Sequence, residues 1–217
     1  MISVPDPICK IADLFGMSRF LEFAITEKDK IKYFLDIIHE QQMHELKEIL
    51  RHDVKDDIVR IYGPEYATPP YLSPEYFDYY VDDYLKEICY HIKAAGAIPR
   101  IHCHGKIKKV VNRFAETEAE MLEPLEPIPD GDIDLKEVKR LYGKRFCLMG
   151  NIELKELEHS DREKIDKLVK DVMESAKEGS GFILMPTAAP INAPLNKRTE
   201  ENYIQMIESA HYYGKYV

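Results

Sequence analysis

The chain has 217 residues, enough for one sizeable hydrophobic core, and its composition shows no flexible tether that would divide it. Charged residues make up 32% of the chain and the formal net charge is -9, so most of its surface would repel nucleic acids and anionic membranes. No apolar run is nearly as long as the about 18 residues that a membrane-spanning helix needs. We therefore expect one cytoplasmic domain, residues 1–217, whose partners are small molecules or proteins.

The first part of the chain, residues 1–55, is predicted to be a helical lead-in. Apolar residues recur at helical spacing over residues 6–15 and again over residues 26–50. Thr26 stands immediately before the second stretch, and a threonine side chain can accept a hydrogen bond from the free backbone N–H groups of a first helical turn. The sequence thus predicts two helices, the second capped by Thr26.

From residue 56 onward, short apolar runs alternate with amphipathic helical stretches. The runs are rich in branched residues and predict five strands, at residues 58–62, 98–102, 121–125, 146–149 and 181–185. The helical stretches lie between and after them, at residues 73–95, 134–142, 160–177 and 199–213. Because strand and helix alternate, with connections too long for hairpins, residues 56–217 predict a parallel sheet with helices packed outside it.

The number of strands sets a limit on the architecture. A closed eight-stranded barrel typically needs about 250 residues, so the expected fold is α/β, a partial (β/α)8 TIM-type barrel with about five parallel strands and outer helices. The two edges of such a sheet carry unpaired backbone groups, which promote association. We therefore expect a homodimer, or a longer chain that completes the barrel.

Polar residues follow each predicted strand, at the end where parallel α/β folds bind ligands. The sharpest feature is His102-Cys103-His104, because strand alternation places the two histidines on one side and Cys103 on the other. Two imidazoles on one face suit zinc or another divalent metal, with Glu126 as the natural third ligand and Glu65 as its rival. Alternatively, the histidines bind substrate carboxylates or backbone carbonyls without a metal.

Three further residues are candidates for substrate binding. The side-chain amide of Asn151, at the end of a strand, can hold a substrate, or it can satisfy its own turn. Tyr62, in a group of tyrosines after the first predicted strand, can pack on a flat ligand or can cover the end of the barrel. Glu65 stands in the same loop and can supply a carboxylate.

The order of several short motifs resembles the uroporphyrinogen decarboxylase superfamily. The motifs are LSPEYF at residues 72–77, IHCHG at 101–105, PLE at 124–126, LMGN at 148–151, GFIL at 181–184 and EN at 201–202. This resemblance implies a (β/α)8 barrel and one of two activities: decarboxylation of uroporphyrinogen, or zinc-dependent methyl transfer with a corrinoid. It covers the chain from about Gly63 to the C-terminus.

The chain departs from both branches of that superfamily. The methyltransferases typically have His-x-Cys-Gly where this chain has His102 and His104, and a second cysteine where the late loop here has Ala188 or Ala189. The decarboxylases carry a histidine in that loop, together with an arginine-rich segment and an aspartate on earlier strands. We expect metal-dependent methyl transfer, with zinc on His102, His104 and Glu126 and a corrinoid protein as the possible methyl donor. The alternatives are a porphyrinogen decarboxylase and a non-catalytic binding module.

Overall fold

The fold is described from a computed structural model, which covers residues 2–216. It is an α/β structure with six strands, the partial TIM-type barrel that the sequence predicts, with one strand more than expected. The chain forms two compact units, Met1–Leu122 and Glu123–Val217, each described here by itself. No helix within residues 2–216 is long and apolar enough to cross a membrane.

The first unit begins with the unexpected strand. β1 (Ile2–Pro5) pairs in parallel with β2 (Ile58–Tyr62), and β2 pairs in parallel with β3 (Ile98–His102). The boundary between the units falls after Leu122, within β4 (Met121–Glu123). The lead-in of residues 1–55 is therefore not purely helical, since a strand of four residues precedes its first helix.

Three helices follow β1, and they begin and end at residues that explain their limits. α1 (Pro7–Phe15) has Asp6 as its N-cap and proline in its first turn, and α2 (Met17–Thr26) follows it after Gly16. α3 (Lys28–Ile49) begins after Glu27. The prediction that Thr26 caps this helix is wrong: Thr26 ends α2, and its hydroxyl donates to the Glu22 carbonyl at 2.9 Å.

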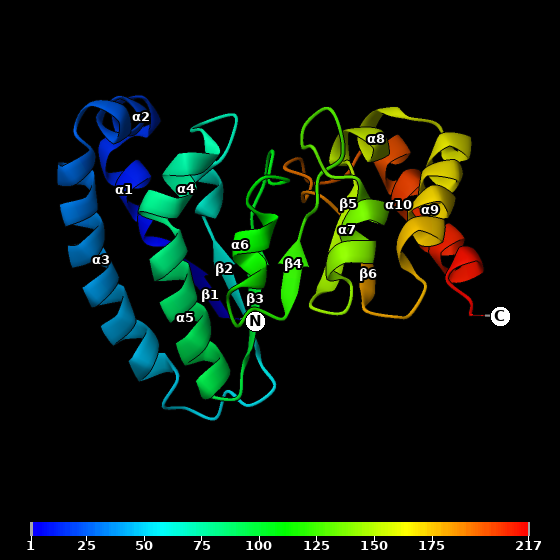
Figure 1. The fold of residues 1–217 in the computed structure, drawn as a ribbon. Helices are drawn as coiled ribbons and strands as arrows, with labels where there is room; N and C mark the ends of the chain where they lie inside the picture. The colour runs from blue at the N-terminus through cyan, green and yellow to red at the C-terminus, as the bar shows by residue number, and fades with distance from the viewer. Residues whose placement is uncertain (1, 217) are drawn as a thin grey trace. The chain divides into compact units, whose positions relative to one another are not determined.

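The predicted helix over residues 73–95 is divided in two. A 3-10 helix, η1 (Pro64–Ala67), is followed by α4 (Pro74–Tyr80) and α5 (Asp82–Ala94), which meet at Val81. The buried residues of α5 recur at helical spacing and include Leu85, Ile88 and Ile92. In Figure 1, α3 and α5 run beside each other along the strands of this unit, and α6 (Val111–Ala115) follows β3.

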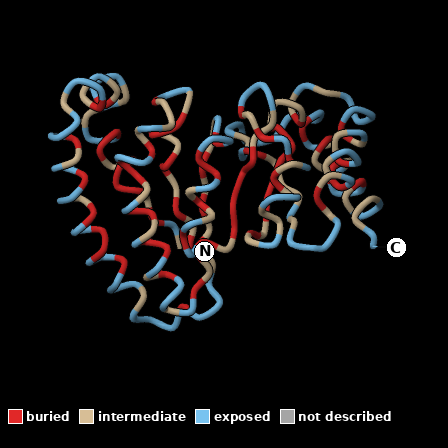
Figure 2. Tube along the Cα trace, in the orientation of Figure 1, coloured by how far each residue is buried: buried red, intermediate tan, exposed pale blue. Residues whose placement is uncertain are grey.

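Burial alternates along β2 and β3. Val59, Ile61 and Ile101 are fully buried, whereas their neighbours in the strands are only half-buried. Figure 2 shows buried and exposed stretches of the chain in different colours. Since successive side chains of a strand point to opposite faces, one face of these strands is packed into the core of the unit, and the other carries its polar residues.

The second unit is built on β5 (Cys147–Ile152) and β6 (Phe182–Pro186), which pair in parallel. Its helices are α7 (Leu135–Tyr142), α8 (Leu154–His159), α9 (Arg162–Ala176) and α10 (Lys197–Tyr213). One apolar cluster joins β5, α8, α9 and α10, and its buried members are Ile152, Leu157, Ile165, Val169, Met173 and Met206. This cluster fixes the end of β5, where Asn151 lies, against the helices.

Candidate functional site

His102 and His104 lie together at the carboxyl end of β3. His102 is the last residue of the strand, and the two imidazole rings are 4.5 Å apart between centroids in an edge-to-face arrangement. Both rings are half-buried, whereas Cys103 between them is buried, with its thiol donating to the His104 carbonyl at 3.8 Å. The structure thus brings together the two histidines that the sequence singled out and directs Cys103 elsewhere.

The backbone after His104 requires glycine. Gly105 has φ +84°, and a Cβ atom at this position would lie 2.7 Å from the Pro69 carbonyl oxygen. The next residue, Lys106, donates its backbone N–H to the same oxygen at 3.0 Å. The loop after β2 therefore packs directly on the loop that carries His104, and only glycine permits this approach.

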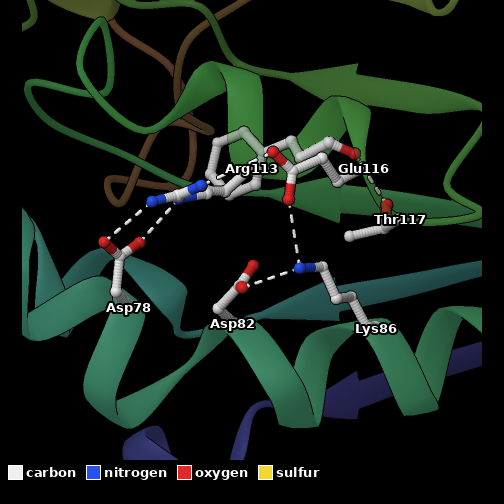
Figure 3. Close-up of polar contacts among 7 residues, drawn as sticks. Asp78, Asp82, Lys86, Arg113, Glu116 and Thr117 are labelled. Atoms are coloured by element: carbon white, nitrogen blue, oxygen red, sulfur yellow. Dashed lines mark hydrogen bonds and ion pairs between the residues drawn. The ribbon is translucent and has the colours of Figure 1, made fainter.

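Ion pairs attach residues 113–116, which follow this loop in the chain, to α4 and α5 (Figure 3). Arg113 of α6 binds Asp78 through two hydrogen bonds, of 2.7 and 2.9 Å. Lys86 of α5 bridges Asp82, at 2.7 Å, and Glu116, at 3.1 Å. The planar guanidinium matches a carboxylate in this two-point geometry, so α6 is held in a fixed orientation. The chain segment after His104 is thus held at its C-terminal end by ion pairs to α4 and α5.

Tyr62 is the direct neighbour of His102 across the β2–β3 ladder. Burial, followed by the nearby Cys9 and Asp13, raises the pKa of the Tyr62 hydroxyl, so this group stays protonated and can donate a hydrogen bond. Glu65 lies in the loop just beyond, and its carboxylate accepts the backbone N–H of Gly63 at 3.0 Å. Both candidate substrate-binding residues of this unit therefore lie near the end of β2, but Glu65 is folded back on its own turn.

Two arginines share the face of Tyr62 and His102. Arg60 and Arg100 are paired across β2 and β3, two residues before Tyr62 and His102 in their strands. The Arg60 guanidinium lies 5.4 Å from the centre of the Tyr62 ring. Sequence reasoning missed this pair, although a charged residue between buried apolar neighbours in each strand was a signal for it.

Asp6 was also missed, because the strand before it was not predicted. The carboxylate is fully buried at the end of β1; one oxygen accepts the Ile8 N–H at 3.0 Å, and the other has no partner. Burial raises its pKa to about 8, against the lowering effect of the Ile8 hydrogen bond, and the nearby Glu65 raises it further. The signal in the sequence was the short branched run of residues 2–4 followed by Pro-Asp-Pro.

Asn151 and Glu126 belong to the second unit. Asn151 is 7% exposed, and its side-chain amide donates to the Leu125 carbonyl at 3.1 Å, so it holds the chain segment before Glu126. The Glu126 carbonyl accepts the Ile133 N–H at 3.2 Å and closes a loop over residues 126–133. The structure thus joins Asn151 to the loop of Glu126. A common rim with His102 and His104, which lie in the first unit, stays a prediction.

The donors present fit a metal only in part. Two imidazoles side by side are suitable zinc ligands, but structural and catalytic zinc sites use at least three protein ligands. Within residues 2–216, no group of three or more histidine, cysteine, aspartate or glutamate side chains is arranged to hold a metal ion. The two histidines alone therefore supply fewer protein ligands than a zinc site uses.

The comparisons with known proteins agree with this fold. Residues 7–213 match the family model of uroporphyrinogen decarboxylase (URO-D), and the chain belongs to this family. A solved structure, "methyltransferase from Methanosarcina mazei", shares the fold with a TM-score of 0.74 and 20% sequence identity. The match covers 98% of this chain but 58% of that one, so the chain spans less than two thirds of the methyltransferase. No curated protein matches the chain.

Proposed function

We propose that this chain takes part in methyl transfer from a corrinoid to a thiol, and that its His102–His104 pair holds the metal that activates the thiol. The observation that carries the proposal is the pair of half-buried imidazoles, 4.5 Å apart at the carboxyl end of a parallel strand. The likeness in fold to a methyltransferase supports it. Where the methyltransferase branch typically has His-x-Cys, this chain has His102 and His104, which offer two nitrogen donors.

Zinc is the proposed metal, and Glu126 is the proposed third protein ligand. A bound zinc ion would lower the pKa of a coordinated thiol and so supply a thiolate at neutral pH. A bound methylcorrinoid would supply the methyl group and keep the electron pair of its carbon–cobalt bond, and the sulfur of the thiol substrate would accept the methyl group. The neighbouring Tyr62 hydroxyl, protonated because its pKa is raised, would donate a hydrogen bond to the substrate.

The proposal is tested by the demethylation of methylcobalamin by small thiols in the presence of zinc, followed by the change in corrinoid absorbance. We expect turnover with the unaltered protein and a loss of at least about tenfold in His104→Ala, because one imidazole ligand is removed. His159→Ala is the matched control, since the His159 side chain is 78% exposed on α8. Absence of turnover with every thiol, or equal rates in the two variants, would contradict the proposal.

A second candidate function is metal-free decarboxylation of a porphyrinogen polycarboxylate. It is favoured by Arg60 and Arg100, which lie on the same face as Tyr62 and His102, because guanidinium groups suit carboxylates. Release of carbon dioxide from uroporphyrinogen in the presence of a metal chelator would support this function and exclude the need for zinc.

A further inference from the structure

The second unit contains a pocket of about 300 Å³ that the proposed metal site does not use. It lies between the loop after β4, the end of β5 and the outer helix α9. Its walls are largely apolar and include Ile128, Leu135, Leu168 and Val172. Volumes of this size are at the lower limit of pockets that bind small molecules.

The polar end of this pocket contains a buried carboxylate without a full set of partners. Glu153 follows the last residue of β5 and is 8% exposed, and its Oε1 atom has no hydrogen-bond partner. Its Oε2 atom is 3.6 Å from the Lys155 ammonium. Although Glu153 occupies the N-cap position of α8, its side chain makes no capping hydrogen bond. An unsatisfied buried oxygen of this kind is costly, unless a ligand completes it.

The charges around Glu153 do not balance. Lys155 is bound at 2.6 Å to Asp130, so two carboxylates share one ammonium group. Asp171 of α9 is a further acidic residue that lines the same pocket. Lys164 does not supply the second positive charge, because it pairs with Glu156 at 2.6 Å. With all these groups ionised, the polar end of the pocket lacks at least one positive charge.

We propose that this pocket binds a small organic ammonium ion, with its charged head on Glu153 and its alkyl part against Ile128, Leu168 and Val172. The head would supply the missing positive charge and a donor for Oε1, and the alkyl part would cover the apolar wall. A bare metal cation would leave that wall uncovered. The inference does not depend on methyl transfer.

The ionisation of Glu153 agrees with this reading. Burial, followed by a side-chain hydrogen bond with Asp130, raises the pKa of the Glu153 carboxyl to about 7. In the empty pocket a proton thus takes the place of the missing cation near neutral pH. An ammonium ligand must displace this proton, so it should bind more tightly as pH rises, whereas a neutral ligand should not respond.

Isothermal titration calorimetry with isopentylammonium tests the proposal on the full chain. At pH 8 we expect one site per chain, and between pH 8 and pH 6 we expect affinity to fall about tenfold as Glu153 takes up its proton. Three control probes change one feature each: isopentanol lacks the charge, isovalerate carries the opposite charge, and potassium chloride lacks the alkyl part. Each should bind at least about tenfold more weakly than isopentylammonium.

Two variants separate the charge from the shape of the pocket. Glu153→Gln should weaken isopentylammonium at least about tenfold and abolish the pH dependence, and Val172→Phe should block binding by filling the apolar end. Glu163→Gln, an exposed position at the start of α9, is the matched control and should bind as the unaltered protein does. No binding by the unaltered protein, equal binding of isopentanol, or a pH-independent affinity would overturn the proposal.

Discussion

Asp6 gives the clearest case of a single residue whose environment sets the stability of the fold. It is fully buried, and its pKa is raised from 3.8 to about 8, first by burial. A carboxyl whose folded-state pKa is raised stabilises the fold fully below its unfolded pKa, and this contribution is lost as pH rises through the folded pKa. Asp6 should therefore make the protein progressively less stable between about pH 4 and pH 8.

Asp6→Asn is expected to remove this dependence. The asparagine keeps an oxygen that can accept the Ile8 N–H, so the cap of α1 should survive. Relative to the unaltered protein, the variant should gain on the order of a few kcal/mol in free energy of unfolding between pH 4.5 and pH 8, as measured by urea denaturation. Asp57→Asn, at an exposed aspartate just before β2, is the control. A variant with the same pH slope as the unaltered protein would show that Asp6 is already ionised in the folded state.

At the scale of elements, Asn202 joins α10 to the end of α8. It is 1% exposed, and its side-chain amide donates to the carbonyls of Leu157, at 3.0 Å, and Ser160, at 2.8 Å. The last carbonyls of a helix have no partner within the helix, so an outside donor must satisfy them. The EN motif at residues 201–202, which carried part of the family resemblance, thus has a structural role in this chain.

Asn202→Asp should destabilise the second unit by about 1–3 kcal/mol, because a carboxylate cannot donate to the two carbonyls and repels them. The free energy of unfolding is measured by thermal or urea denaturation followed by circular dichroism. Asn192→Asp introduces the same chemical change at an exposed position and should have little effect. Equal stability of the two variants would mean that water satisfies the carbonyls in place of Asn202.

Helices and strands were predictable where the pattern was long or was marked by a cap, and not where it was short. The helical stretches predicted over residues 134–142 and 199–213 correspond to α7 (Leu135–Tyr142), which Asp134 caps, and to α10 (Lys197–Tyr213). β1 was missed because four residues are too few to show alternation. The break at Val81 was missed because apolar residues continue across it, and only packing shows that α4 and α5 are separate helices.

At the scale of the whole molecule, the family and the partial barrel were predictable because they depend on the order of strands, helices and motifs along the chain. The candidate site was predictable only in part. His102 and His104 lie together as expected, because a single residue separates them, although β3 ends at His102 and His104 lies just beyond it. Glu153 was not foreseen, because its importance depends on burial and on Asp130, which lies 23 positions earlier in the chain. The homodimer, the single domain and the cytoplasmic location stay predictions.

The central claim, that His102 and His104 bind a metal, is tested most directly by X-ray absorption spectroscopy of the zinc-loaded protein. We expect one zinc ion per chain with two imidazole ligands, and one imidazole fewer in His104→Ala, because each ring supplies one nitrogen donor. A zinc spectrum without imidazole scattering, or one unchanged in His104→Ala, would contradict the account.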